Sequence, residues 1–307
     1  MKQMEKSYVF YQGQIVEENQ VKVSIRSKAL NYGLGCFEGI RAYWDEEKQQ
    51  LYGFALKEHY ERLLNSCKTL NMNIPYTVEE LCQWTVEVLK KNKCKTTTYI
   101  RPLVYKGSEE LSPSLFDKDD RIVIYTQPLG SYMGKDVLKV AVSSWRRISD
   151  TMLPPRTKAT GGYLNSALAS FEAVGNGFDE AIFLTNQGFV CEGAAENIFL
   201  VKNGKLITPP VSDDILEGIT RAVVIELAEK ELGMEVVERS VSRTELYNAD
   251  EVFFSGTAME VTGVVEVDRR TVADGQEGKV CKELKALFDG LTKGNNPKYA
   301  HLCTPVY

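Results

Sequence analysis

Five segments carry side chains or backbone groups whose types and spacing are suited to chemistry. They are RTKATGGYL with Lys158, LEGITR with Gly218 to Thr220, SGTAME with Ser255 to Ala258, FVCEGAAEN with Glu192, and TYIRPLVY with Tyr99 and Arg101. Lys158 stands among small residues, with Tyr163 five positions later. A lysine amine can form an imine, and its pKa falls readily when it is desolvated. Most loop lysines are solvated, so this segment alone leaves both interpretations open.

Two of the segments could bind a phosphate through backbone amides. At Gly218, Ile219 and Thr220 a helix is expected to begin, so amides, the helix dipole and a hydroxyl converge there. In SGTAME, small residues would let a ligand approach the backbone closely. Each segment also has an ordinary interpretation: Thr220 as a helix cap, and SGTAME as a turn or bulge.

Three charged side chains are also open to two interpretations. Glu192 follows an apolar stretch and must be solvated, which is commoner, or matched to a cation. Arg101 shares a strand face with Tyr99 and could grip a carboxylate, although Pro102 also suits an edge strand with a snorkelling arginine. Arg62 points away from the apolar stripe of its helix, as a surface arginine would.

The elements around these segments predict two α+β domains. Strands and helices are mixed along the chain without strict βαβ alternation, which argues against a doubly wound sheet. Residues 1–126 are expected to form a smaller N-terminal domain and 137–307 a larger C-terminal one, with 127–136 as the linker because it holds a proline, two glycines and no periodicity. Among the local signals, YVFYQGQIVEE is a hairpin pattern around Gly13, Thr77 and Glu80 form a capping box, and Asn203-Gly204 marks a second hairpin turn.

Composition excludes several classes of function. The 307 residues carry a formal net charge of -5, which disfavours nucleic acid as a partner. No apolar run is long enough for a membrane span and the N-terminus lacks a signal-peptide core, so a cytoplasmic location is expected. Seven cysteines without a close CxxC pair and only two histidines make a metal site or a histidine triad improbable.

Taken together, the segments resemble the fold-type IV aminotransferases that use pyridoxal 5'-phosphate, and most closely the branched-chain amino acid aminotransferases. The ordered spacing EGAAENIF, LIT and LEGITR between Glu192 and Arg221 carries the resemblance most specifically. LNYGLGCFEGIRAYW, HYERL, YIRPL, VSSWRR and TKATGGYL extend it over nearly the whole chain. The family implies a smaller and a larger α+β domain with the active site between them.

The resemblance also implies roles for individual residues. Lys158 matches the Schiff-base lysine that moves the substrate proton, Glu192 the carboxylate at the pyridine nitrogen, and Tyr163 the phenol near O3'. The phosphate positions match Arg62, Ile219, Thr220 and Thr257. The substrate positions match Tyr32 of a partner subunit, Phe37, Tyr99, Arg101, Tyr132, Thr257 and Ala258.

The expected activity is reversible, ping-pong transamination of leucine, isoleucine or valine with 2-oxoglutarate, in a homodimer or a higher oligomer. Three alternatives remain: a D-amino acid aminotransferase, an aminodeoxychorismate lyase of the same fold, and a non-catalytic protein that binds a phosphate ligand. Thr160 stands where many relatives have glycine, and Leu129 where some have a large aromatic residue. Because of both departures, amino acids with an aromatic side chain, or methionine, remain open as further substrates.

Overall fold

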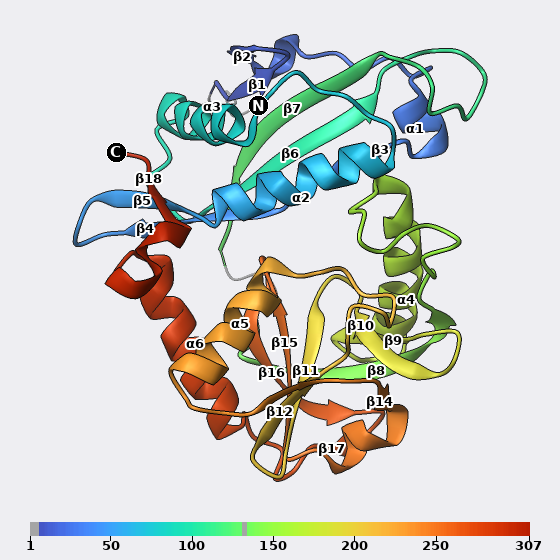
Figure 1. Cartoon of the computed structure of the whole chain (residues 1–307), viewed down its shortest axis with the longest axis vertical. Coiled ribbons are helices and arrows are strands. Elements are labelled where there is room, and N and C mark those ends of the chain that lie inside the picture. The colour runs from blue at the N-terminus through green and yellow to red at the C-terminus, as the bar shows by residue number, and fades with distance from the viewer. Residues whose placement is uncertain (1–5, 131–133) are drawn as a thin grey trace. The chain divides into compact units, whose positions relative to one another are not determined.

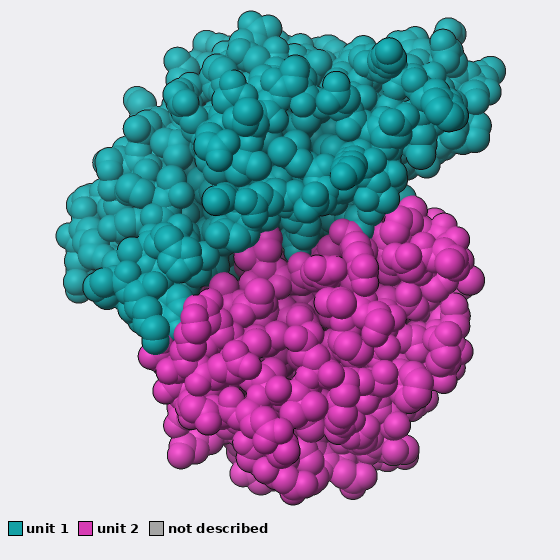
Figure 2. Space-filling view, in the orientation of Figure 1, with its two compact units in different colours: residues 1–130, 157–161, 291–307 teal, residues 131–156, 162–290 magenta. Residues whose placement is uncertain are grey.

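The computed structural model describes residues 6–130 and 134–307, which divide into two compact units (Figures 1 and 2). Unit 1 comprises residues 1–130, 157–161 and 291–307, and unit 2 comprises residues 131–156 and 162–290. Each unit contains its own sheet and its own helices, which agrees with the expected α+β class. No helix in the described part of the chain is long and apolar enough to cross a membrane.

Unit 1 contains an eight-stranded sheet. Its strands are β1 Tyr8–Tyr11, β2 Gln14–Glu17, β3 Gly35–Phe37, β4 Ile40–Asp45, β5 Gln50–Phe54, β6 Thr98–Lys106, β7 Asp120–Pro128 and β18 Cys303–Pro305. The order is β18-β5-β4-β6-β7-β1-β2, with β3 also paired to β6. The β1–β2 pair is the hairpin that the sequence predicts around Gly13, which has a φ of +88°.

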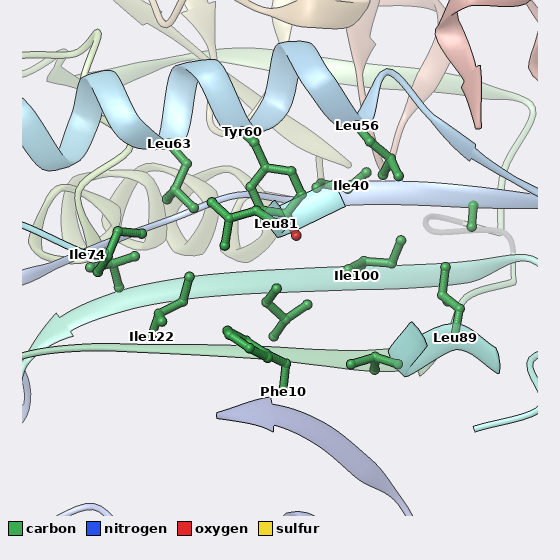
Figure 3. Packing of buried hydrophobic residues seen from close by; sticks show 14 of the residues in the cluster. Phe10, Ile40, Leu56, Tyr60, Leu63, Ile74, Leu81, Leu89, Ile100 and Ile122 are labelled. Atoms are coloured by element: carbon green, nitrogen blue, oxygen red, sulfur yellow. The ribbon is translucent and has the colours of Figure 1, made fainter. Parts of the chain in front are cut away.

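The described part of unit 1 also contains helices. They are α1 Lys28–Tyr32, α2 Leu56–Thr69, α3 Val78–Lys91 and the short 3-10 helices η1 Glu18–Gln20 and η4 Pro297–Leu302. The predicted capping box at Thr77 and Glu80 is present at the start of α3. Tyr60 and Leu63 of α2 point toward Ile40 and Ile100 of the sheet, and Leu81 of α3 joins the same buried cluster (Figure 3). Burial of this apolar layer is the main force that holds α2 in place.

Strand β6 is central, so its interpretation as an edge strand is wrong. Pro102 pairs in register with Ile124 of β7, while its carbonyl accepts a hydrogen bond from the Glu38 amide on the other side. In a strand, the N–H and C=O of one residue point to the same side. The side of Pro102 that lacks an N–H therefore faces the interruption between β3 and β4. The hydrogen bonds between β6 and β7, on the other side of the strand, do not require that N–H.

Unit 2 contains a ten-stranded sheet. Its strands are β8 Val137–Arg146, β9 Glu180–Leu184, β10 Phe189–Gly193, β11 Asn197–Lys202, β12 Lys205–Thr208, β13 Val236–Glu238, β14 Val241–Ser242, β15 Glu251–Gly256, β16 Glu260–Val267 and β17 Arg270–Thr271. The order is β13-β12-β11-β15-β16-β8-β9-β10-β14, with β17 on β16. The β11–β12 hairpin turns at Asn203 and Gly204 with positive φ at both residues, as predicted.

The sheet of unit 2 curls around one core. Val237 of β13 and Val241 of β14, at opposite ends of the strand order, pack into one apolar cluster with Ile182 and Leu200. The helices are α4 Tyr163–Gly175, α5 Ile219–Lys230, α6 Lys279–Thr292 and the 3-10 helix η3 Arg243–Asn248, while the 3-10 helix η2 Thr160–Gly162 begins in the last residues of the unit 1 segment 157–161. Ala169 and Ala173 of α4 cover Phe183 on the outer face of β9. Alternate residues of β9 therefore serve two different cores.

The two units are not continuous in sequence, unlike the expected division into 1–126 and 137–307. Residues 157–161 join unit 1 because Ala159 forms a β-bridge with Cys36, and residues 291–307 join it because β18 pairs with β5. Within the expected linker 127–136, Gln127 and Pro128 still belong to β7. Such pairings join residues far apart in sequence, so local composition does not reveal them.

Candidate active site

The segment of Lys158 is attached to β3 through its backbone. The Phe37 amide donates to the Lys158 carbonyl over 3.1 Å, and the Lys158 amide donates to the Ser66 hydroxyl of α2 over 3.3 Å. The Thr160 hydroxyl lies 2.7 Å from the Gly33 carbonyl, to which it donates. Lys158 is half-buried, and contacts on both sides of its backbone fix the segment.

Three predicted substrate-side residues of unit 1 lie together beside this lysine. The Arg101 guanidinium carbon lies 4.2 Å from the Phe37 ring centroid and 5.1 Å from that of Tyr99. Its Nη2 donates to the Tyr99 hydroxyl over 2.8 Å, and the Lys158 ammonium lies 5.3 Å from the Phe37 ring centroid. A Cβ at Gly39 would collide with the Tyr99 hydroxyl, so only glycine permits this position of the phenol.

Arg62 is not a surface arginine. Its Nε and Nη2 each donate over 2.8 Å to a different carboxylate oxygen of Glu38. His59, one helical turn earlier in α2, places Nδ1 2.7 Å from Oε2 of the same carboxylate. Glu38 is fully buried, and only 13% of the Arg62 side chain is exposed.

These contacts decide the charges of the cluster. Burial alone would raise the pKa of Glu38, but the charge and hydrogen bonds of Arg62, together with the bond from His59, outweigh it and lower that pKa far below the usual range. Burial lowers the pKa of His59, and the charges of Arg62 and Lys158 add to this effect against the opposing influence of Glu38. A neutral His59 therefore donates from Nδ1 to an ionised Glu38 beside a cationic Arg62.

In unit 2, Glu192 is buried and matched to a cation, so its interpretation as a solvated residue is wrong. It is 4% exposed at the end of β10. Arg147 Nη2 lies 2.7 Å from Oε1, while the Asn197 side-chain amide and the Leu216 backbone amide donate to Oε2 over 3.1 and 3.0 Å. The fold thus supplies a positive charge and two neutral donors to this carboxylate.

Asn197 connects Glu192 to the two predicted phosphate segments. Its Oδ1 occupies the space that a Cβ at Gly218 would need, and Gly218 is the N-cap of α5. In the strand register, Asn197 pairs with Ser255, which stands two residues before Thr257 in the turn between β15 and β16. The start of α5 and this turn therefore lie close to the same asparagine.

Thr220 does not cap its helix, because it is the second residue of α5 and Gly218 makes no side-chain cap. Amides at an uncapped helix start point outward along the axis, where they and the helix dipole favour an anion. Thr220 is itself buried. The segment 257–258 is a turn, as its ordinary interpretation holds, and a turn also presents amides.

The residues of unit 2 fit a flat polar cofactor with a phosphate. Among the described residues, Ser255 Oγ and Arg147 Nε are buried polar atoms without a hydrogen-bond partner, and both lie on segments that adjoin Glu192 or Asn197. Leaving buried polar atoms unpaired is costly, so such atoms mark a place where polar groups bind. The start of α5 adds a position suited to an anion.

The other predicted residues are placed as follows. Tyr163 begins α4 and is half-buried, and Asn165, two residues later, accepts from the Ile148 amide and donates to the Arg146 carbonyl, on either side of Arg147. Tyr32 ends α1 and is 39% exposed. Tyr132 lies outside the described residues.

Sequence reasoning missed three side chains that hold this site together. Arg147 appears only inside VSSWRR, where the pair of arginines at the end of β8 is the one signal for a cation at this position. Glu38 and His59 gave no signal of their own. The i, i+3 spacing of His59 and Arg62 places both on one side of α2, but the sequence does not indicate that a carboxylate lies there.

Comparison with known proteins agrees with this arrangement. Residues 35–267 match the family described as Amino-transferase class IV. The chain is 46% identical over 308 residues to a probable branched-chain-amino-acid aminotransferase of Aquifex aeolicus, covering 100% of this chain and 99% of that protein.

Two solved structures are similar over the whole length. The branched-chain aminotransferase of Thermoproteus uzoniensis with norvaline has a TM-score of 0.95 and 44% identity, and the match covers 99% of this chain and 100% of that one. The T.th. branched-chain amino acid aminotransferase complexed with N-(5'-phosphopyridoxyl)-L-glutamate has a TM-score of 0.92 and 37% identity, with the same coverage. The chain belongs to the class IV aminotransferases, and within them to the family of branched-chain-amino-acid aminotransferases.

Proposed function

We propose that the protein uses pyridoxal 5'-phosphate to transfer the amino group of leucine, isoleucine or valine reversibly to 2-oxoglutarate in a ping-pong reaction. The observation that carries the proposal is the half-buried Lys158, held by backbone bonds beside Phe37 and Arg101. Norvaline and a phosphopyridoxyl glutamate are bound by two similar proteins, which supports one apolar and one acidic amino acid as the substrate pair.

The cofactor supplies an electron-withdrawing ring that makes the α-proton of an amino acid acidic. Lys158 would hold the cofactor through its amine, and once the substrate's amino group has displaced that amine, the freed Nζ would carry the Cα proton to the cofactor carbon on the other side of the transferred nitrogen. Glu192 would keep the ring nitrogen protonated, since a carboxylate held by Arg147 supplies a fixed negative charge. Tyr163 would lie near the phenolic oxygen of the ring, and Arg62, Thr220, Thr257 and the Ile219 amide would hold the phosphate.

Recognition of the substrate carboxylate belongs to Arg101 and Tyr99. Their mutual hydrogen bond and the Phe37 ring beneath the guanidinium fix both donors in one orientation. Ala258 and Thr257 add backbone amides on the same substrate side. Phe37 forms part of the pocket for the side chain. The hydroxyl of Thr160 is bonded to the Gly33 carbonyl, so we assign it to fixing the lysine segment and not to substrate choice.

We further propose a homodimer in which Tyr32 of the partner subunit completes the pocket. Leu164, Phe171 and Val174 lie along one face of α4 and are 67%, 80% and 58% exposed, which is typical of a surface that another protein covers. Sedimentation at micromolar concentration should give twice the mass of the 34.5 kDa chain. A single-chain mass would reject the shared pocket. A cytoplasmic location remains our proposal, supported by seven free thiols.

The decisive test replaces Lys158 by alanine. The variant should lose the visible absorbance of the bound cofactor and at least about 1,000-fold in turnover of L-leucine with 2-oxoglutarate, because both attachment and proton transfer are removed. Lys57→Ala is the control, since Lys57 is an exposed lysine of α2. Retention of both signals in Lys158→Ala would reject the proposal.

A substrate comparison distinguishes the alternatives. Faster turnover of D-alanine than of L-leucine by the unmodified enzyme would favour the D-amino acid branch of the fold. Release of pyruvate from aminodeoxychorismate would favour the lyase. Absence of any cofactor absorbance would favour a protein that only binds a phosphate ligand.

A further inference from the structure

Glu38 is a buried ionised side chain to which the proposed function assigns no role. The hydrogen bonds described above join its carboxylate to α2: both oxygens accept from Arg62, and Oε2 also meets His59. Burial of an isolated carboxylate is strongly unfavourable, so a fully buried glutamate is retained where its charge has a task.

The position of Glu38 in the chain suggests that task. Phe37 faces Arg101 and Lys158, while Gly39 adjoins the Tyr99 hydroxyl. Successive residues of an extended segment point to opposite sides. Glu38 therefore points away from the substrate residues and toward α2, and it connects the substrate side of unit 1 to Arg62.

We propose that Glu38 is a positioning residue that fixes the Arg62 guanidinium for the phosphate of the cofactor, an inference that rests on the proposed function. The carboxylate takes one hydrogen each from Nε and Nη2, out of the five N–H donors of the group. Such a bidentate contact fixes the guanidinium plane as well as its location.

The physical effect is preorganisation. A free arginine side chain samples many rotamers, and ordering it on binding opposes affinity. Because Glu38 orders Arg62 during folding, the cofactor phosphate meets a guanidinium that is already oriented. His59 completes the arrangement, since its neutral Nδ1–H fills a further acceptor site of the carboxylate without adding a second positive charge.

The test measures the affinity of the apoenzyme for pyridoxal 5'-phosphate and for pyridoxal, which lacks the phosphate. Glu38→Gln should weaken pyridoxal 5'-phosphate binding by about tenfold or more, since it removes a charged hydrogen-bond pair. The affinity for pyridoxal and the turnover at saturating cofactor should stay within about twofold of the values for the unmodified enzyme. A change of that size is smaller than the loss of one hydrogen bond would cause. Glu61→Gln, an exposed neighbour of Arg62 in α2, is the matched control.

Two further variants keep the test independent of folding. Glu38→Asp retains the charge and should recover part of the affinity lost in Glu38→Gln. In an Arg62→Ala background, Glu38→Gln should cause no additional loss for the phosphate form, because Glu38 acts through Arg62. Equal losses for pyridoxal and its phosphate, or unchanged or tighter binding of the phosphate, would overturn the inference.

The outcomes also separate this inference from the proposed function. If Arg62→Ala weakens cofactor binding and Glu38→Gln does not, the positioning role fails and transamination stands. If the unmodified enzyme transfers no amino group, the proposed function fails by a measurement that does not involve Glu38.

Discussion

Each unit buries one glutamate against one arginine, and the two pairs are built differently. In unit 1, Glu38 receives His59 and Arg62, which are one turn apart on a single helix. In unit 2, Glu192 receives Arg147, Asn197 and Leu216, which come from three separate segments. One pair depends on the short link between β3 and β4 and on one helix, whereas the other depends on three segments of its unit.

The pairs also differ in which member is proposed to meet the cofactor. Under the proposed function, Arg62 would offer a cation to the phosphate while Glu38 holds that arginine, and Glu192 would offer an anion to the ring nitrogen while Arg147 holds that glutamate. A buried charge of either sign is stable only with a partner. The comparison teaches that the same ion pair can present either charge, depending on which residue the fold turns toward the ligand.

The largest expected effect distinguishes the pairs by the kinetic constant that changes. Glu192→Gln should lower kcat by about 100-fold or more, because an amide does not hold a proton at the ring nitrogen during the reaction. The cofactor affinity should change less than in Glu38→Gln, where binding and not turnover is expected to suffer. Steady-state and stopped-flow measurements with L-leucine would determine kcat, and titration of the apoenzyme with the cofactor would determine the affinity.

The exposed Glu217→Gln, close in sequence to Leu216, serves as the control for that variant. The contrast between the pairs would not hold if Glu192→Gln weakened cofactor binding and left kcat unchanged.

A smaller effect would refine the description of the unit 1 pair. His59 should titrate below the ordinary histidine value of 6.5, because burial and the nearby positive charges disfavour its protonated form. The contribution of His59 to stability is then complete above pH 6.5 and decreases as the pH falls through the lowered pKa, since the unfolded chain binds the proton first. Proton NMR suits this measurement because the chain has only two histidines.

His59→Gln assigns the resonance and should remove that part of the acid dependence of unfolding. A His59 signal with its midpoint at or above 6.5 would contradict a neutral donor beside Glu38 and weaken the difference between the two pairs.

Local patterns predicted much of the secondary structure. The β1–β2 hairpin, the α3 capping box and the Asn203-Gly204 turn are confirmed, since each depends on residues within a few positions of one another. The edge placement of β6 was wrong because Pro102 faces an interruption in the neighbouring strand, which its own sequence does not reveal.

In the candidate site, too, local sequence predicted one part and long-range contacts decided the other. The sequence by itself determined the residue types of the site, since the ordered motif from Glu192 to Arg221 carries the family resemblance. Only the tertiary structure decided that Lys158 joins β3, that Arg62 meets Glu38, and that Arg147 meets Glu192. The physical reason is that a charge is buried only where a distant partner compensates it, and such partners are set by strand pairing and helix packing rather than by spacing along the chain.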